Sequence, residues 1–497
     1  MKRETRQDVI DGLSGFFSRG VRDAAACSGD PQEKALCLFH EVARTVPAYS
    51  RFLAEQGVRP EDISCAADFE RIPCATKENY LRRHPLPDLC RDGAIGSSDM
   101  IAVSSGSTGG PFFWPRFLKD ELLVAERFEQ LFCNSFQADT KSTLAVICFT
   151  LGTWVGGLYT LSCCRQLAWK GYPITSVAPG SNIAEILRVV RELARHFEQT
   201  VLLGYPPFLK LVIDEGAAAG VPWKACNIRL VTAGEVFSEE WRDLMATRIG
   251  STRPCFDFAS LYGTADAGVL ANETPLSISI RRFLGKNPGA ARDLFGESRL
   301  PTLAQYDPFS RFFEVRNSSL LFTGDNGIPL VRYGILDNGG LVTFDQMMAF
   351  LSQRGFDPLE DLRSEAHCAQ QPFVYVFGRS DFTISYFGAN IYPEQIQPAL
   401  EQPGIADWVT GKFVMQVMPN QDQESILSIV VEMAYGAERD SRKQRRIEEE
   451  ILLHLLRNNS EFANYVPPAS QAPEVRLAPH GDPEYFAAAG KHRYSRR

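Results

Sequence analysis

Hydrophobic and polar residues follow two different periods along this chain, and the change of period predicts its secondary structure. Apolar residues at helical spacing, such as Val9, Leu13 and Phe16, predict helices in residues 1 to about 60. Between about residues 100 and 350, short β-rich runs alternate with amphipathic stretches. This β–α–β rhythm predicts an open, largely parallel sheet with helices on its faces.

The clearest elements of this rhythm lie in the middle of the chain. The pattern predicts strands at residues 144–149, 201–204 and 228–232, and helices at 183–197 and 207–219. Ligands of such sheets bind beyond the carboxyl ends of the strands, so the loops that follow these strands are the first candidates for a functional site.

A second, smaller unit begins near Val376. Its pattern predicts an α+β domain of about 120 residues, with strands at 373–377, 413–418 and 426–433 and helices at 393–402 and 442–458. We therefore expect two domains, a large one at residues 1–377 and a small one at residues 378–497.

Composition narrows the class of protein. Of the 497 residues, 44% are hydrophobic and 23% are charged, which is typical of a soluble globular protein. The formal net charge of −8 argues against a nucleic-acid partner. No apolar run reaches the ~18 residues of a membrane span, and no secretory signal is recognisable, so we expect no membrane association and a cytoplasmic location. The sequence does not decide the oligomeric state, although a dimer is compatible with it.

The twelve cysteines do not indicate a metal site. None forms a Cys-x-x-Cys pair, and several lie in apolar stretches, as Cys148, Cys163 and Cys164 do. The sequence therefore predicts buried free thiols rather than structural zinc.

One loop carries candidate chemistry. Residues 104–111 read Ser-Ser-Gly-Ser-Thr-Gly-Gly-Pro, and such a loop can surround a polyphosphate with backbone N–H groups and hydroxyls. It is not a Walker A loop, because no Lys-Ser/Thr pair closes it. Taken alone, it could equally be a flexible turn.

Five further stretches accompany this loop in order. They are Ala-Gly-Glu at 233–235, Leu-Tyr-Gly-Thr-Ala-Asp at 261–266, Arg-Tyr-Gly-Ile-Leu-Asp at 332–337, Gly-Arg-Ser-Asp at 378–381 and Gly-Lys-His-Arg at 490–493. Tyr262 could stack on a purine, Asp266 could hold magnesium, and Asp337 could accept both hydroxyls of a ribose. Each also has an ordinary explanation, such as core packing for Tyr262, a turn for Asp337 and a solvated tail for Lys491.

As an ordered set, these motifs resemble those of the adenylate-forming superfamily of acyl-CoA synthetases, and most closely its phenylacetate–CoA ligase branch. The segment Ile-Pro-Cys-Ala-Thr-Lys at 72–77 is similar to the one that precedes the phosphate loop in that family. The resemblance implies an α/β fold, with a large N-terminal domain of mixed and parallel sheets and a small mobile α+β C-terminal domain. It extends from about residue 70 to the end of the chain.

The resemblance also implies an activity. Enzymes of this superfamily join ATP and a carboxylic acid into an acyl-AMP, release pyrophosphate and pass the acyl group to a thiol. ATP, Mg²⁺ and coenzyme A are therefore the expected cofactors and co-substrates, and a small-molecule acid is the expected substrate. Other acceptors remain open, namely a carrier protein or an amine. So do activation of a non-carboxylate oxyanion and a nucleotide-binding protein that has lost its chemistry.

Carried over residue by residue, the resemblance gives each motif a role. Lys491, Asp266 and Thr108 would be catalytic, Asp266 would hold the metal, and Asp381 would be the hinge. The nucleotide would contact Ser104, Ser105, Gly106, Ser107, Thr108, Gly109, Gly234, Glu235, Tyr262, Gly263, Thr264, Asp337 and Arg379.

Three departures from the family pattern bear on activity. Gly110 stands where many relatives carry Lys, Asp266 replaces the more usual Glu, and residues 334–336 are unusually apolar. The first two could weaken phosphate and magnesium contacts without removing the charges that adenylation needs.

The acid pocket is expected between the strand at 144–149, the turn at 151–157 and the loops around Gly204 and Ala233. We expect Phe149, Trp154, Tyr205 and Phe258 to line it, which would suit an aromatic or other flat, apolar acid. Ordinary core packing is the alternative for each of them.

Overall fold

The structure is a computed structural model. It describes residues 6–18, 29–103, 112–152, 155–297, 300–362, 369–379, 384–386, 389–419, 425–459, 462–463, 466–486 and 494–495.

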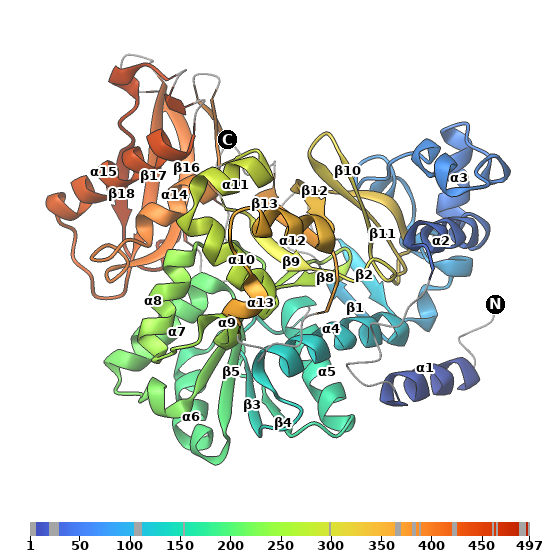
Figure 1. The fold of residues 1–497 in the computed structure, drawn as a ribbon, viewed down its shortest axis with the longest axis horizontal. Helices are drawn as coiled ribbons and strands as arrows, with labels where there is room; N and C mark the ends of the chain where they lie inside the picture. Colours follow the sequence, from blue (N-terminus) through green and yellow to red (C-terminus); the bar gives the residue numbers. More distant parts are fainter. Residues whose placement is uncertain are drawn as a thin grey trace.

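An eleven-stranded sheet forms the centre of the part that the structure describes, in the order β10-β11-β12-β13-β9-β8-β7-β6-β5-β3-β4 (Figure 1). The half from β7 to β4, which comes first in the chain, is parallel and agrees with the predicted rhythm. The parallel strands are β3 (Thr143–Ile147), β4 (Ile174–Val177), β5 (Gln199–Gly204), β6 (Ile228–Ala233) and β7 (Phe258–Thr264). The helices between them are α5 (Val155–Trp169), α6 (Ile183–Leu193), α7 (Pro206–Ala218), α8 (Glu239–Ile249) and α9 (Pro254–Asp257).

Every residue of β3 and β5 is buried, as expected for parallel strands covered on both faces. Alternate side chains enter two separate hydrophobic clusters. Val146 and Leu202 pack with α6 and α7, while Ala145 and Val201 pack with α5 and α4 (Leu118–Phe136). The sheet is therefore held rigidly where its loops present the site.

The other half of the sheet, from β8 to β10, is antiparallel, so the expectation of a largely parallel sheet is wrong for this half. Its strands are β8 (Gly268–Asn272), β9 (Thr302–Gln305), β10 (Phe312–Arg316), β11 (Ser319–Gly324), β12 (Leu330–Val342) and β13 (Phe373–Arg379). The direction reverses at residues 265–267, because a turn this short between β7 and β8 joins strands only in antiparallel fashion. Four helices follow in this region: α10 (Pro275–Lys286), α11 (Pro288–Phe295), α12 (Phe344–Ser352) and α13 (Pro358–Asp361).

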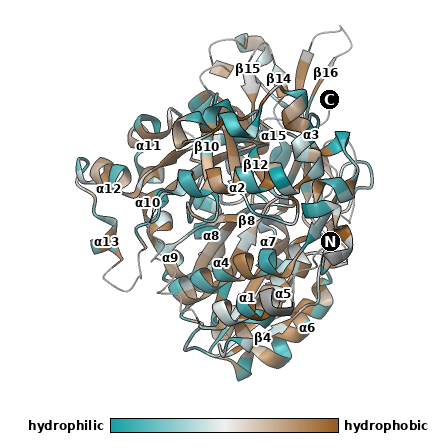
Figure 2. Cartoon of the chain, turned by 90° about the vertical axis from the view of Figure 1, so that its right-hand side faces the viewer, coloured by the Kyte–Doolittle hydropathy of each residue, from teal (hydrophilic) through white to brown (hydrophobic). Residues whose placement is uncertain are grey.

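The helices predicted for the first 60 residues are present in the described part as α1 (Arg6–Ser18), α2 (Pro31–Thr45) and α3 (Pro47–Glu55). Asp30 caps α2 by accepting a hydrogen bond from the N–H of Gln32, and Pro31 follows it at the first helical position. In Figure 2, α2 carries both hydrophilic and hydrophobic residues, and Phe39 and Val42 on its apolar face are buried. A two-stranded ribbon of β1 (Met100–Val103) and β2 (Phe113–Arg116) lies on either side of the serine- and glycine-rich loop.

The described residues between 384 and 495 form what we call the C-terminal unit, which has its own hydrophobic core and lies to one side of the sheet in Figure 1. It consists of β14 (Ile384–Tyr386), β15 (Ala389–Ile391), α14 (Pro393–Leu400), β16 (Val409–Pro419), β17 (Ser425–Met433), α15 (Ser441–Asn458) and β18 (Glu474–Ala478). Sequence patterning missed β18, which pairs with β17 in parallel. The expected domain boundary falls inside β13, because Gly378 and Arg379 still pair with β12.

Among the described helices, none combines the length and the apolar character that crossing a membrane requires.

Candidate active site

A cavity of about 300 Å³ lies at the carboxyl ends of the parallel strands. Its polar side is lined by the turn after β6, the end of β7 with the turn that follows it, the middle of β12, and the near side of the C-terminal unit. The predicted motifs at 233–235, 261–266 and 332–337 therefore reach one cavity, although about 100 residues of sequence separate the turn after β6 from the middle of β12.

Tyr262 and Asp337 form the polar centre of this cavity. The Tyr262 hydroxyl donates to Asp337 Oδ2 at 2.7 Å, and both side chains are nearly buried. The Tyr262 ring stacks on Phe313, with centroids 6.5 Å apart and planes 22° from parallel. The backbone of Arg379 pairs with that of Asp337 across β13 and β12. The aromatic ring and the predicted ribose acceptor thus lie side by side.

The turn after β6 requires glycine at Gly234. This residue has φ +82°, and a Cβ atom there would lie 2.8 Å from Cε1 of Tyr205. Both Gly234 and the next residue, Glu235, line the cavity, as do Gly263 and Thr264 on the end of β7.

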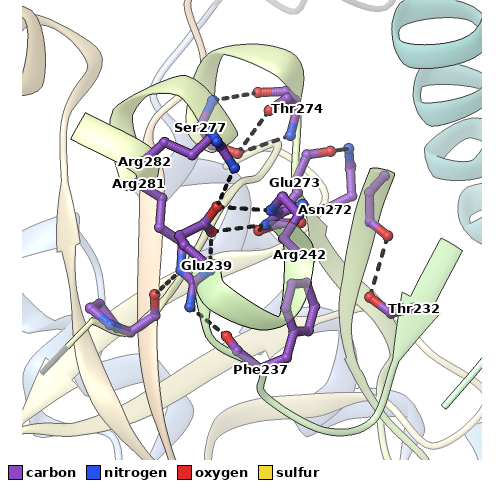
Figure 3. A network of polar contacts seen from close by, with 12 residues as sticks. Thr232, Phe237, Glu239, Arg242, Asn272, Glu273, Thr274, Ser277, Arg281 and Arg282 are labelled. Atoms are coloured by element: carbon purple, nitrogen blue, oxygen red, sulfur yellow. Dashed lines mark hydrogen bonds and ion pairs between the residues drawn. The ribbon is translucent and has the colours of Figure 1, made fainter. Parts of the chain in front are cut away.

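A buried ionic network supports this turn from behind (Figure 3). Arg281 donates to the Phe237 carbonyl at 2.6 Å and pairs with Glu239. Arg242, which is fully buried, pairs with Glu239 at 3.0 Å and with Glu273 at 2.7 Å. Buried charges of this kind are stable only with their partners, so the network holds the residues after Glu235 in place.

Asp266 is held by two partners. Lys77 Nζ lies 3.2 Å from Oδ1, and the Tyr333 hydroxyl donates to Oδ2 at 2.6 Å. Lys77 reaches this position because its segment runs beside β12, where Ala75 N–H donates to the Arg332 carbonyl at 3.1 Å. The described residues contain no cluster of three metal-ligating side chains. A Mg²⁺ ion at Asp266 would have to take further ligands from outside the protein, which substrate phosphates can supply.

Negative charge dominates the cavity wall. Its described lining contains the carboxylates Glu235, Asp266, Asp337 and Glu394, and Lys77 is the one lysine or arginine among those lining residues. An anionic ligand in this cavity would therefore need positive charge from groups besides Lys77.

The apolar end of the cavity is aromatic. Phe149 and Tyr205 line it and meet edge to face, with centroids 5.0 Å apart. Burial and the nearby Glu235 raise the pKa of Tyr205 to about 12, so its hydroxyl stays protonated.

The structure corrects the expectation for Phe258, which packs with Trp241 in the core. Phe258 is the first residue of β7, at the amino end of the strand, whereas the cavity opens at the carboxyl end.

Several predicted site residues lie outside the described part of the chain. They are the phosphate-loop residues Ser104, Ser105, Gly106, Ser107, Thr108 and Gly109, together with Trp154, Asp381 and Lys491. The backbone of Arg379 is described, but its side chain is not.

Sequence reasoning also missed residues that line the cavity. Lys77 stood in a motif without an assigned role, and Tyr494 lies three residues after the predicted catalytic lysine. Glu394 and Gln397 lie on one face of α14, a spacing of three that could have marked them as neighbours. By contrast, the first turn of α5, with Val155 and Gly156, belongs to the turn beside which the sequence places the acid pocket, and it completes the wall.

Comparison with known proteins agrees with the motifs. No family model matches the chain. It is similar to the phenylacetate–coenzyme A ligase of Aromatoleum evansii, with 19% identity over 368 residues that cover 71% of this chain and 70% of that protein. The phenylacetate–coenzyme A ligase of Thermus thermophilus is 23% identical over 393 residues, which cover 74% of this chain and 76% of the relative.

Among solved structures, a 2-hydroxyisobutyryl-CoA ligase in the postadenylation state, in complex with R3-HIB-AMP, is similar in fold. Its TM-score is 0.65 at 13% identity, and the match covers 94% of this chain and 88% of the other. The expected α/β fold, with a large N-terminal part and a smaller C-terminal part, is thereby confirmed, as is the resemblance to the adenylate-forming superfamily.

Proposed function

We propose that this chain activates a carboxylic acid with ATP as an acyl-AMP, releases pyrophosphate and passes the acyl group to coenzyme A. One observation carries the proposal: an aromatic ring hydrogen-bonded to a buried carboxylate, Tyr262 to Asp337, beside a glycine turn at the carboxyl ends of parallel strands. The relatives named above are called phenylacetate–coenzyme A ligases, which supports an acid as substrate and coenzyme A as acceptor.

In this proposal the nucleoside lies along the polar side of the cavity. Adenine would pack against the ring of Tyr262 and the backbone of Gly234, and Asp337 would accept the ribose hydroxyls. A carboxylate that accepts two hydroxyls makes charge-assisted hydrogen bonds, which are the stronger kind. Arg379 would add a cation near the ribose, and residues 104–110 would surround the β- and γ-phosphates.

Adenylation brings two anions together, because the acid carboxylate attacks the α-phosphoryl group. The reaction needs positive charge where the two meet. Lys77 supplies one charge at the cavity wall, and we assign the second to Lys491. Mg²⁺ held by Asp266 and the phosphates would neutralise further charge when bound.

The acid would occupy the aromatic end of the cavity. Phe149 and Tyr205 present two ring surfaces at right angles, and Val155 and Gly156 leave an apolar wall beside them. An aromatic acid fits this lining better than a short polar one. After adenylation, rotation of the C-terminal unit about Asp381 would replace Lys491 with the incoming thiol.

The test is pyrophosphate release from ATP and Mg²⁺ across a panel of aromatic, aliphatic and amino acids, first without and then with coenzyme A. Acid-dependent release that rises with coenzyme A is the expected result. Release that does not change with coenzyme A but rises with a phosphopantetheine-bearing carrier protein or an amine would show that this other compound is the acceptor. The absence of release with every acid would overturn the proposed activation of carboxylic acids.

A further inference from the structure

One contact at the cavity joins the C-terminal unit to the large sheet region and has no role in the chemistry above. The Tyr494 hydroxyl donates to the carboxylate of Glu235. Tyr494 is only 7% exposed, and both residues line the cavity. Burial and the Glu235 charge raise the pKa of Tyr494 well above its ordinary value, so the phenol remains a donor.

Tyr494 is firmly part of the C-terminal unit. The N–H of Met415 on β16 donates to the Tyr494 carbonyl at 2.7 Å, and the ring packs against Phe413 with centroids 5.0 Å apart. Ser495 continues this contact as a bridge to Met415. The hydroxyl therefore reaches across from one packed unit to the other.

The same turn of the large region makes two more contacts with the C-terminal unit. Gln397 Nε2 donates to the Val236 carbonyl at 3.1 Å, and the Ser238 hydroxyl donates to Glu401. Gln397 lies on α14 and Glu401 directly follows the helix, one turn further along. Each side chain is only 5% exposed.

Residues 234–238 thus contact both the cavity and the C-terminal unit. One side lines the cavity through Gly234 and Glu235, and the other side holds the C-terminal unit through Glu235, Val236 and Ser238. Behind the turn, Arg281 and Glu239 hold it in the network of Figure 3. A turn anchored in this way cannot adjust to a displaced partner at low cost.

We infer that residues 234–238 are a docking latch for the C-terminal unit, and that Tyr494 is a positioning residue for the adenylation step. This inference rests on the proposed function. Lys491 lies three residues before Tyr494, and three residues of chain span at most about 10 Å. Fixing the Tyr494 hydroxyl on Glu235 therefore limits how far Lys491 can move away from the cavity.

The test uses Tyr494→Phe, which removes the hydroxyl and keeps the ring against Phe413. A hydrogen bond to a charged group contributes about 1.5–3 kcal/mol, so the kcat of acid-dependent pyrophosphate release should fall about 10- to 100-fold. The KM for ATP should change less than about twofold, because Tyr494 acts through the tail rather than on the nucleotide. Thioester formation from supplied acyl-AMP should be unchanged.

Two further variants sharpen the test. Glu235→Gln should reproduce the loss, and the double variant should be no worse than either single one, since both remove the same contact. Tyr386→Phe is the matched control. It also removes a buried tyrosine hydroxyl, which donates to the Ser470 carbonyl at 2.9 Å within the C-terminal unit, and should leave kcat unchanged.

A readout independent of activity separates this inference from the proposed function. In the absence of substrates, hydrogen exchange of residues 228–238 should accelerate in Tyr494→Phe and not in Tyr386→Phe. Unchanged exchange together with unchanged kcat would overturn the latch. If wild-type protein released no pyrophosphate with any acid while exchange still accelerated, the proposed function would fail and the docking contact would stand.

Discussion

Glu401 gives the structure a specific dependence on pH. Its carboxyl group is 5% exposed between α14 and the Ser238 turn, and burial raises its pKa from 4.5 to about 8. The Ser238 and Gln397 contacts oppose this shift, and the neighbouring Glu240 adds to it. Tyr494 also faces the group, and His454 faces Glu240.

The sign follows from the direction of the shift. An acid with a raised pKa binds its proton more tightly when the protein is folded, so this group costs nothing below pH 4.5 and destabilises increasingly as pH rises to about 8. At about 1.4 kcal/mol per pH unit, the cost at pH 7 is on the order of 3 kcal/mol.

Glu401→Gln removes this cost. The amide keeps an oxygen for Gln397 to donate to, and its N–H₂ can donate to the Ser238 hydroxyl. The variant should match wild type in thermal unfolding at pH 5 and exceed it by a few °C at pH 8. Subtracting the two proteins cancels the titration of His454. Glu240→Gln, at an exposed carboxyl on α8, is the control and should show a much smaller difference. An equal gain at pH 5 and pH 8 would refute the reasoning, because it would mean that Glu401 does not titrate in this window.

Three further changes test the cavity itself. Gly234→Ala forces an alanine to φ +82° and drives its Cβ against Tyr205, so ATP binding measured by calorimetry should weaken, whereas Gly220→Ala, with φ +76° and open space around it, should not affect binding. Asp337→Ala removes the charged acceptor that we assign to the ribose, and the Kd for ATP should rise about 10- to 100-fold; an unchanged Kd would move the nucleotide elsewhere. Lys491→Ala should lower the rate of acyl-AMP formation about 100- to 1000-fold without changing the melting temperature, and a rate near wild type would remove this lysine from the chemistry.

The motifs predicted the polar side of the cavity because they carry backbone geometry as well as side chains. Tyr262 and Asp337 are 75 residues apart, yet each belongs to a short motif that contains a Tyr-Gly pair and lies on a strand. The parallel strands were equally visible, since continuous apolar runs such as residues 144–147 have few other interpretations. The antiparallel half was not, because its direction depends on the length of one turn.

Other parts of the site depend on packing that no local pattern records. Lys77 faces the cavity only because residues 72–77 run beside β12. Phe258 looked like a lining residue but begins its strand at the wrong end. Tyr494 carried no prediction, and its place at the cavity is visible only in its contact with Glu235, 259 residues earlier.

The central claim is that an acid carboxylate attacks the α-phosphoryl group of ATP. It is tested most directly with the acid that gives the largest pyrophosphate release, labelled with ¹⁸O in its carboxylate, under single-turnover conditions with coenzyme A. Adenylation predicts one ¹⁸O atom in the AMP product, because the carboxylate oxygen stays on phosphorus when the thiol takes the acyl group. Label in inorganic phosphate with ADP as the nucleotide product, or unlabelled AMP, would contradict the claim.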